Sequence, residues 1–358
     1  MARHRIVGIN FDHMHMGDLL RLVVAHPDAE VVGVWHHEPD TPREVLGRLG
    51  LDESLIFEDW RACMEQTSPT VAIVCASTGG HGEWACKVAE YGVDVLVEKP
   101  FAANLADADA MTEAVHSKGK RLAINWPLAW YPPHRTAKRL VDEGLIGELR
   151  SVTYYDGNRG PARHKMDKVE TVVEDSPEAK NKLWWYQKDQ SGGSLQDYLG
   201  YGTTLGTWYH DGKKPLEVTC MVDEPAGLEV DEHSVTVARY ASGLSKFETR
   251  WGTFTDPWSH QPQPRCGFVL CGSAGTISSY DYQETIHVQT QDRPEGYDIA
   301  VDPLVHPYTD GVNYFLDCID NDRPIEGPLS PEICRIGQQI VDTAARSAAE
   351  KKTLPLLD

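Results

Sequence analysis

Short apolar runs alternate with amphipathic helical patterns along the first third of the chain. One β-branched run, at residues 5–9, is followed by apolar positions at helical spacing, among them Leu19, Leu20 and Val23. Strands that alternate with helices form a parallel sheet through right-handed crossovers. We expect strands at residues 5–9, 30–35, 56–57, 71–76, 93–97 and 122–125, and helices at 16–26, 42–49, 59–66, 81–91 and 104–117. The pattern therefore predicts an α/β domain with a doubly wound parallel sheet over residues 1–126.

Beyond residue 126 the pattern changes, because few helices separate the strands. Strands joined without a crossover helix pair antiparallel. We expect a helix at 133–143, strands at 149–155, 216–222, 234–240, 245–253, 267–272 and 285–289, and a closing helix at 331–349. The polar stretch 158–182 is expected to be a loop or lid. Residues 127–358 are thus predicted to form an α+β domain with a large, mostly antiparallel open sheet.

Composition narrows the class of partner. The chain has 358 residues, and 34 Lys and Arg against 54 Asp and Glu give a formal net charge of −20. Such a surface repels phosphate backbones and anionic lipids, so we expect no nucleic-acid or membrane partner. The eight cysteines are dispersed without a CxxC pair, and no apolar leader precedes the first strand. Both features indicate reduced thiols and a cytoplasmic location.

The predicted strand at residues 93–97 is followed by charged residues. The apolar run 93–97 is followed directly by Glu98, Lys99 and Pro100. A Lys at the end of a buried strand costs free energy unless its charge is needed there. In open α/β sheets, ligands bind outside the carboxyl ends of the strands, which is where Lys99 would lie. We therefore interpret Lys99 as a candidate active-site residue.

The turn after the first strand is the place where a dinucleotide would bind. A dinucleotide fingerprint has three glycines, whereas this turn keeps only Gly8 and has Asn10 and His13 at the other two positions. Asn tolerates a left-handed turn, so Asn10 can replace a glycine. His13 and His15 could donate to a phosphate or a substrate, and no further ligand spacing supports a metal, so we expect none.

Polar residues at other strand ends complete the expected cofactor site. The second strand ends at His36 rather than at an acid, which leaves NAD and NADP both open. The fourth strand is followed by Ser77 and Thr78, which could instead only cap a helix. The predicted cofactor contacts are Gly8, Asn10, Phe11, Asp12, His13, His36, Ser77, Thr78, His81, Glu98, Lys99 and Asn125.

A second polar group lies far downstream, after Gly192 and Gly193. Asp197 and Tyr201 are four residues apart, so on a helix they lie one turn apart on the same face. The two glycines would let the backbone approach a flat ligand closely.

Taken in order, these motifs resemble the glucose-fructose oxidoreductase, inositol dehydrogenase and MocA family (Gfo/Idh/MocA). The resemblance rests on Glu98-Lys99-Pro100, residues 144–148 (GLIGE), Gly192-Gly193-Ser194 with Asp197, and Ser347-Ala348. It implies an N-terminal Rossmann domain, a C-terminal sheet domain, a nicotinamide cofactor that can be tightly bound, and a carbohydrate or cyclitol substrate. It also implies a homodimer or homotetramer and a cis bond between Lys99 and Pro100.

By position, the resemblance implies that Lys99, Asp197 and Tyr201 form the catalytic group. Many relatives have His where this chain has Tyr201. Hydride transfer leaves a hydroxyl proton that needs a base, and a phenol is a poor base unless a nearby ammonium lowers its pKa. We expect Lys99 to act in this way on Tyr201, with Asp197 orienting the pair.

Aromatic and cationic residues suit the substrate side, because aromatic rings pack on sugar faces. The predicted substrate contacts are Tyr155, Arg159, Arg163, His164, Lys165, Trp184, Trp185 and Tyr186, together with Asp197 and Tyr201. The expected function is an NAD(P)-dependent oxidoreductase acting on a secondary hydroxyl of a sugar, glycoside or cyclitol. The alternatives are a redox-neutral glycosidase or lyase that works by transient oxidation and elimination, and a non-catalytic dinucleotide-binding sensor.

Overall fold

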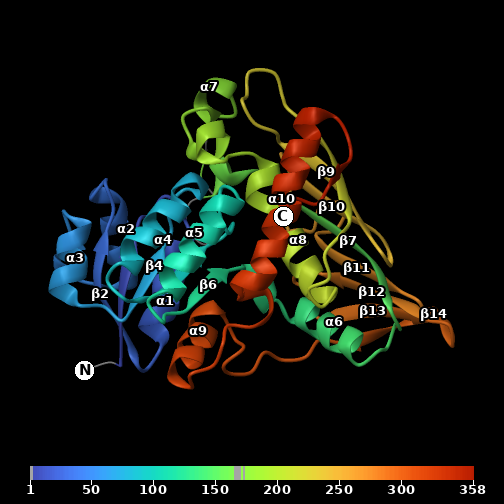
Figure 1. The fold of residues 1–358 in the computed structure, drawn as a ribbon, viewed down its shortest axis with the longest axis horizontal. Helices are drawn as coiled ribbons and strands as arrows, with labels where there is room; N and C mark the ends of the chain where they lie inside the picture. Colours follow the sequence, from blue (N-terminus) through green and yellow to red (C-terminus); the bar gives the residue numbers. More distant parts are fainter. Residues whose placement is uncertain (1–2, 165–170, 172–173) are drawn as a thin grey trace. The chain divides into compact units, whose positions relative to one another are not determined.

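A computed structural model describes residues 3–164, 171 and 174–358, and the chain divides into two compact units (Figure 1). The first unit contains the chain up to Asn125, and residues 306–331 group with it although they come later in the sequence. The second unit contains Trp126–Arg163, the stretch from 174 to 305, and Glu332–Asp358.

The first unit is built on a six-stranded sheet, counted over the described residues, with the strand order β3-β2-β1-β4-β5-β6. All neighbouring strands in it are parallel. The strands are β1 (His4–Ile9), β2 (Ala29–Trp35), β3 (Ile56–Phe57), β4 (Val71–Val74), β5 (Asp94–Glu98) and β6 (Leu122–Asn125). The order reverses direction between β1 and β4, which is the switch point where doubly wound folds bind ligands.

Helices cover both faces of this sheet, as right-handed crossovers require. They are α1 (Met16–Ala25), α2 (Asp40–Leu49), α3 (Trp60–Thr67), α4 (His81–Ala89), α5 (Leu105–His116) and α9 (Gly311–Asp320). Helix α1 packs with α2 and α9, whereas α4 packs with α5 and contacts α3 through Trp84 against Trp60. Every residue of β4 and β5 is buried, as expected for central strands covered on both faces.

The second unit is built on a nine-stranded sheet, again counted over the described residues, ordered β14-β13-β12-β11-β7-β10-β9-β8-β15. All neighbours are antiparallel except the parallel pair β7 and β10. The strands are β7 (Leu149–Asn158), β8 (Glu217–Asp223), β9 (His233–Tyr240), β10 (Gly243–Trp251), β11 (Gly267–Gly272), β12 (Gly275–Tyr280), β13 (Thr285–Thr290), β14 (Arg293–Ala300) and β15 (Leu354–Pro355). The predicted fold class, a doubly wound parallel sheet followed by a mostly antiparallel one, is confirmed.

Among the described residues, the second unit contains the α-helices α6 (Pro132–Asp142), the short α7 (Pro177–Lys180), α8 (Ser194–Tyr209) and, from its second residue on, α10 (Pro331–Glu350). Helix α8 packs on β7, β9 and β10, and α6 packs on β12 and β13. Exposed and buried side chains alternate along β10, where Phe247 is buried and Leu244 is half exposed. One face of the sheet therefore meets helices, and the other carries the exposed side chains.

Several elements of the described chain were not predicted, among them the short α7 and β15, strands β12 and β14, and helix α9. Strands β12 and β14 contain Gly275, Ser278, Ser279, Pro294 and Gly296, which weaken the strand signal, and pairing with neighbouring strands creates them. Helix α9 was also missed, although Asp310 caps it by accepting a hydrogen bond from the Asn313 amide at 2.8 Å. No described helix is long and apolar enough to cross a membrane.

Candidate functional site

Lys99 lies at the buried carboxyl end of β5. Glu98 is fully buried and the Lys99 side chain is only 3% exposed. The Lys99–Pro100 bond is cis, as the resemblance implied. A buried ammonium at this edge of a parallel sheet is costly unless it serves a ligand or a charged partner.

Glu98 is the centre of a hydrogen-bonded group. Its Oε2 accepts a hydrogen bond from Asn125 Nδ2 at 2.8 Å, across the β5–β6 pair, and its Oε1 lies 2.7 Å from His15 Nδ1. Burial alone would raise the pKa of Glu98, but His15, Lys99 and the Asn125 hydrogen bond outweigh it and hold that pKa below its ordinary value. Glu98 is therefore ionised at neutral pH, so His15 Nδ1 carries the proton and donates.

The turn between β1 and α1 has the shape of a nucleotide-binding turn, although it keeps only Gly8 of the three glycines. Asn10 has a φ of 65°, in the left-handed region that was expected for it from the sequence. Gly8 lets α1 approach β1, because a Cβ there would lie 3.2 Å from Met16 Sδ. Several backbone amides of the turn have internal partners; for example, Phe11 N donates to His36 Nδ1 and His13 N donates to the Cys75 carbonyl, each at 3.2 Å.

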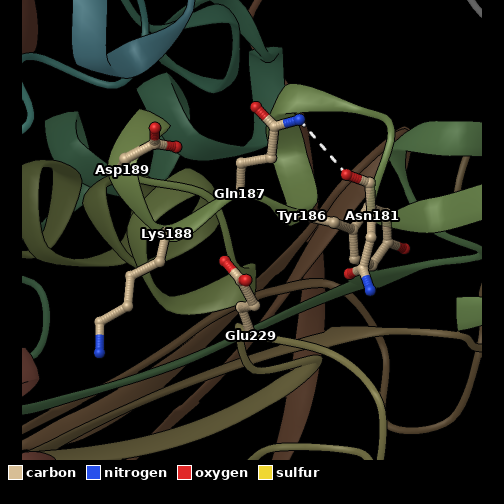
Figure 2. A pocket seen from close by; sticks show the side chains of 6 residues that line it. All are labelled: Asn181, Tyr186, Gln187, Lys188, Asp189 and Glu229. Atoms are coloured by element: carbon tan, nitrogen blue, oxygen red, sulfur yellow. Dashed lines mark hydrogen bonds between the residues drawn. The ribbon is translucent and has the colours of Figure 1, made fainter. Parts of the chain in front are cut away.

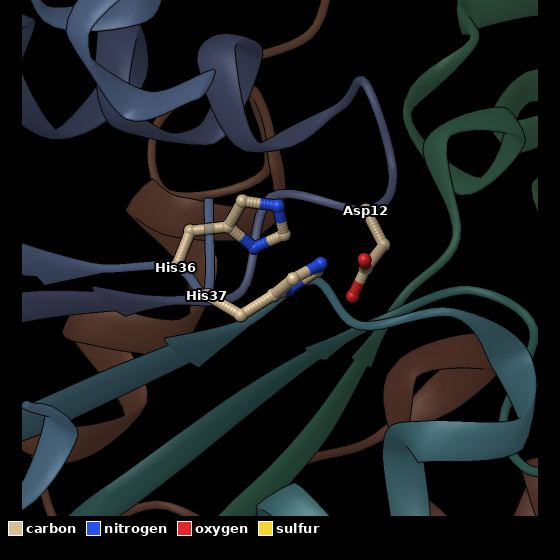
Figure 3. Close-up of side chains that lie close together, drawn as sticks. All are labelled: Asp12, His36 and His37. Atoms are coloured by element: carbon tan, nitrogen blue, oxygen red, sulfur yellow. The ribbon is translucent and has the colours of Figure 1, made fainter. Parts of the chain in front are cut away.

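Asp12, His36 and His37 bring side-chain ligand atoms within 4.8 Å of one another, and Figure 3 shows the His37 ring beside the Asp12 carboxylate. Burial, assisted by His37, lowers the pKa of His36 to about 4, so the ring is neutral. Its Nδ1 accepts from Phe11 N, so Nε2 carries the proton and acts as a donor. This tautomer suits a hydroxyl ligand better than a metal ion. Burial raises the pKa of Asp12, while His37 and the Ser77 amide oppose the rise.

Residues after β4 were also expected to contact the cofactor. Ser77 N donates to Asp12 Oδ2 at 3.2 Å. The ring nitrogens of the fully buried His81 face two backbone carbonyls, with Nδ1 2.8 Å from the Pro100 oxygen and Nε2 3.1 Å from the Ala76 oxygen. This geometry gives His81 a role in holding the ends of β4 and β5 together.

Two buried polar atoms in this region have no hydrogen-bond partner among the described residues: Asn10 Oδ1 and Thr78 Oγ1. Buried polar groups are almost always paired, so a ligand with its own donors and acceptors is the expected partner. Together with the left-handed turn at Asn10, they show that this part of the first unit fits a nucleotide. Residues that would hold it are Asn10, Asp12, His36 and Thr78.

The second predicted group lies on α8 of the second unit. Asp197 and Tyr201 are buried, 3% and 6% exposed, and stand one turn apart. The Tyr201 ring packs edge-on against Trp126, with ring centroids 5.1 Å apart. Lys99 belongs to the first unit, so a joint site of Lys99, Asp197 and Tyr201 stays a prediction.

The glycines before α8 are explained by the chain itself. A Cβ on Gly192 would lie 2.3 Å from the Trp185 carbonyl oxygen, and Gly193 has a φ of 105°. The close approach expected for a flat ligand is therefore already made by backbone. Asp231 accepts from Ser194 Oγ and from Leu195 N, which fixes the start of the helix.

The predicted substrate residues fall into several environments. Arg159 is paired with the fully buried Asp256, its Nε 2.9 Å from Oδ2, and Arg163 is paired with Asp175 at 2.9 Å. The Tyr155 hydroxyl is buried without a hydrogen-bond partner among the described residues. His164 is buried and groups with the first unit.

Trp184 and Trp185, two of the predicted substrate contacts, are both half-buried, and their rings stack with centroids 4.5 Å apart. Trp185 packs against the buried cluster of Tyr186, Val230 and Trp251. Lys165 lies outside the described residues.

The second unit has an open pocket of about 710 Å³, and Figure 2 shows the side chains that line it. Its lining is polar: Asn181, Tyr186, Gln187, Lys188, Asp189 and Glu229. Gln187 Nε2 donates to the Asn181 carbonyl at 3.3 Å, which holds one wall. Of these lining residues, Tyr186 was expected to contact substrate, and the others were not.

Sequence reasoning considered His15 only as a donor to a phosphate or a substrate, and it assigned no role to His37 or Asp231. Each is joined to its partner over a long separation; His15 and Glu98, for example, are 83 residues apart. The available signal was topological, since polar residues that follow neighbouring parallel strands meet at one edge of the sheet.

Comparison with known proteins agrees with this arrangement. Residues 3–126 match the family model described as "Oxidoreductase family, NAD-binding Rossmann fold". Residues 134–278 match the model described as "GFO/IDH/MocA C-terminal domain".

Three curated relatives are similar to this chain. The scyllo-inositol 2-dehydrogenase (NAD(+)) of Bacillus subtilis is 29% identical over 136 residues, which are 38% of each protein. The levoglucosan dehydrogenase of Pseudarthrobacter phenanthrenivorans is 24% identical over 76% of this chain and 72% of its own length. The inositol 2-dehydrogenase of Rhizobium meliloti is 20% identical over 94% of each.

Solved structures show the same fold. An inositol dehydrogenase homolog complexed with NAD+ from Azotobacter vinelandii superposes with a TM-score of 0.80 at 14% identity, covering 99% of this chain and 98% of that one. A levoglucosan dehydrogenase in complex with NADH and levoglucosan superposes with a TM-score of 0.78 at 19% identity over 99% of both chains.

Proposed function

Because this chain belongs to the Gfo/Idh/MocA family of oxidoreductases, with its NAD-binding Rossmann fold, we propose that it oxidises a secondary hydroxyl of a sugar, glycoside or cyclitol. The observation that carries the proposal is the buried Lys99 at the carboxyl end of β5, in the unit whose turn fits a nucleotide. The names of the relatives, inositol and levoglucosan dehydrogenases, support the substrate class.

In the proposed reaction NAD, or NADP in its place, supplies the hydride acceptor. Lys99 donates a hydrogen bond to the reacting oxygen and, with Tyr201, forms the acid–base pair that removes the hydroxyl proton. Asp197, one turn before Tyr201 on α8, orients the pair. The two units thereby have separate roles, with the first holding the cofactor and the second presenting substrate groups.

Among the proposed substrate groups, Tyr155 has a buried hydroxyl available to a hydrogen bond from a sugar, and Trp184 offers a half-buried ring face. Arg159 and Arg163 are already paired with carboxylates, so they would contact substrate only with part of their donors. We therefore favour a neutral polyol over an acidic sugar.

The experiment is a screen of inositols, anhydrosugars, aldoses and glycosides with NAD and NADP, followed at the nicotinamide absorbance band. Turnover of at least one polyol is expected. Cofactor binding without turnover of any polyol would refute the dehydrogenase. Product formation without net reduction of NAD, with deuterium uptake at C2 of the sugar, would show the redox-neutral glycosidase or lyase instead.

We also propose a homo-oligomer formed through the sheet of the second unit. Met221 on β8 is 78% exposed and Leu244 on β10 is 51% exposed, and both are large apolar side chains on strands. Light scattering of the native chain beside Met221→Glu tests it: a dimer or tetramer that dissociates in the variant is expected, and a monomeric native chain would refute it.

A further inference from the structure

The His15 ring is held by a buried carboxylate and open at its other nitrogen. His15 Nδ1 donates to Glu98 Oε1 at 2.7 Å, with the side chain of His15 25% exposed and that of Glu98 fully buried. Among the residues that the structure describes, Glu98 is the one side chain with which the His15 ring forms a hydrogen bond. His15 Nε2 therefore presents a lone pair that can accept a proton.

Glu98 cannot turn away from His15. Its second oxygen accepts from Asn125 Nδ2 at 2.8 Å, and β5 and β6 hold both residues in register. A buried carboxylate that orients a histidine ring also stabilises the imidazolium that forms when the ring takes a proton. The pair is thus built as an acid–base unit.

The His13 ring packs against the His15 ring and is held by the His15 backbone amide. His15 N donates to His13 Nδ1 at 3.2 Å, and the two rings lie edge to face with centroids 4.4 Å apart. His13 is neutral, because burial, followed by the charges of Lys99, His15 and His81, lowers its pKa well below the ordinary value. His13 therefore leaves the proton-accepting role to His15.

The charged and titratable groups around His15 also include Lys99. The Lys99 charge acts on the pKa values of both Glu98 and His13, so all four side chains share one electrostatic environment. Within this group Lys99, Glu98 and His13 are at most 3% exposed, whereas His15 is partly exposed. His15 is therefore the member of this group with the largest exposure to solvent.

We propose that His15, oriented by Glu98, is the proton relay between the Lys99 side of the site and solvent. The inference rests on the proposed function. Oxidation of a secondary hydroxyl sends the hydride with two electrons to NAD, and the carbinol carbon becomes a carbonyl. The hydroxyl proton passes through the Lys99–Tyr201 pair to His15 Nε2 and is released to water, and the reverse path serves reduction.

His13, His15 and Glu98 also place ligand atoms within 4.8 Å of one another, which raises a metal as the competing interpretation. The hydrogen bonds oppose it, because His13 Nδ1 accepts from His15 N and His15 Nδ1 donates to Glu98. A zinc ion bound through His13 Nδ1 or His15 Nδ1 would replace one of these bonds.

The first test needs no substrate. In ¹⁵N-labelled protein, the His15 ring nitrogens, assigned by comparison with His15→Asn, should show a protonated Nδ1 and an unprotonated Nε2. A ring protonated at Nε2 and bare at Nδ1 would overturn the proposal. One zinc ion bound per chain, measured by elemental analysis of the purified protein, would also overturn it.

The second test is kinetic, with the polyol that the screen finds. Asn at position 15 keeps a donor for Glu98 and loses the titratable ring. We expect His15→Asn to lower kcat about 10- to 100-fold, less than loss of a direct base because water can substitute in part. KM and the Kd for NADH should stay within about twofold, and imidazole should restore the rate of His15→Ala.

His116→Asn, an exposed histidine on α5 of the same unit, is the matched control and should keep the native rate. A His15→Asn enzyme with native kcat, or one that loses NADH affinity in parallel with kcat, would overturn the relay while leaving the dehydrogenase intact. Failure of the proposed function is distinguishable, since it would show as no turnover by the native chain whatever the His15 tautomer.

Discussion

Asp231 accepts a hydrogen bond from Ser194 Oγ at 2.6 Å, and the same oxygen accepts from Leu195 N at 3.0 Å. Asp231 is buried, and it joins the segment before β9 to the first turn of α8. A carboxylate at a helix N-terminus satisfies amides that have no intrahelical partner. Asp231 therefore fixes the helix that carries Asp197 and Tyr201.

This contact predicts a specific pH dependence of stability. Burial raises the pKa of Asp231 to about 6, although the Ser194 and Leu195 hydrogen bonds oppose the rise. Between about pH 4 and 6 the folded state binds more protons than the unfolded state, so stability falls as the pH rises through this window. The difference from the ordinary pKa corresponds to about 3 kcal/mol at most.

Asp231→Asn removes this titration. The variant should be less stable than the native chain at pH 4, and its deficit should shrink by pH 7, measured as the midpoint of thermal unfolding. Asp292→Asn, at an exposed position, is the control and should follow the native curve. A deficit independent of pH would contradict the prediction.

Gly200 is predicted to be essential for the packing of α8. A Cβ at this position would lie 2.4 Å from Trp126 Cη2, so Gly200→Ala must displace the indole that packs on Tyr201. We expect a loss of about 1–3 kcal/mol in the free energy of unfolding. Gly47→Ala on α2, where a Cβ meets nothing within 4 Å, should instead stabilise by about 0.5–1 kcal/mol. Urea unfolding of both variants decides; equal effects would refute the packing argument.

Asn10 should tolerate only residues that accept a left-handed backbone. Its φ is 65°, so Asn10→Gly should keep stability but lower NADH affinity, because the amide side chain is lost, whereas Asn10→Ala should cost about 1–2 kcal/mol in stability. Thermal unfolding and fluorescence titration with NADH measure the two quantities. Native stability of Asn10→Ala would show that the turn adopts another conformation.

Asp12 is predicted to favour NAD over NADP. Its carboxylate lies beside His36 and His37 at the end of β2, where doubly wound folds hold the ribose hydroxyls. A carboxylate there repels a 2′-phosphate. Asp12→Asn should lower the ratio of the Kd for NADPH to the Kd for NADH about 10-fold. This change is on the order of one charge interaction near a protein surface. An unchanged ratio would place the ribose away from Asp12.

Tyr201→Phe tests the acid–base pair. The substitution keeps the ring that packs on Trp126 and removes the hydroxyl, so folding and NADH binding should be unchanged. We expect kcat to fall about 10²- to 10⁴-fold, the usual contribution of general acid–base catalysis. Lys99→Ala should reduce kcat at least as much. A Tyr201→Phe enzyme with a near-native rate would exclude Tyr201 as the base.

Local patterns were enough for most of the secondary structure. The strand over 93–97 and the helix over 331–349 were expected within one residue at each end of β5 and α10, because apolar periodicity and caps are properties of short windows. Strands β12 and β14 escaped prediction because their glycines and prolines oppose a strand locally, and neighbouring strands supply the pairing.

The sequence by itself determined the fold class, the left-handed turn at Asn10 and the charged end of β5, because each follows from the chemistry of adjacent residues. Only the tertiary structure decided that Glu98 binds His15 and that Asp231 holds the start of α8. It also decided that the Trp185 carbonyl occupies the space that a side chain at Gly192 would need. These partners are brought together by sheet order and packing. No local pattern encodes them, because a hydrogen bond between distant residues depends on where the whole chain places both groups.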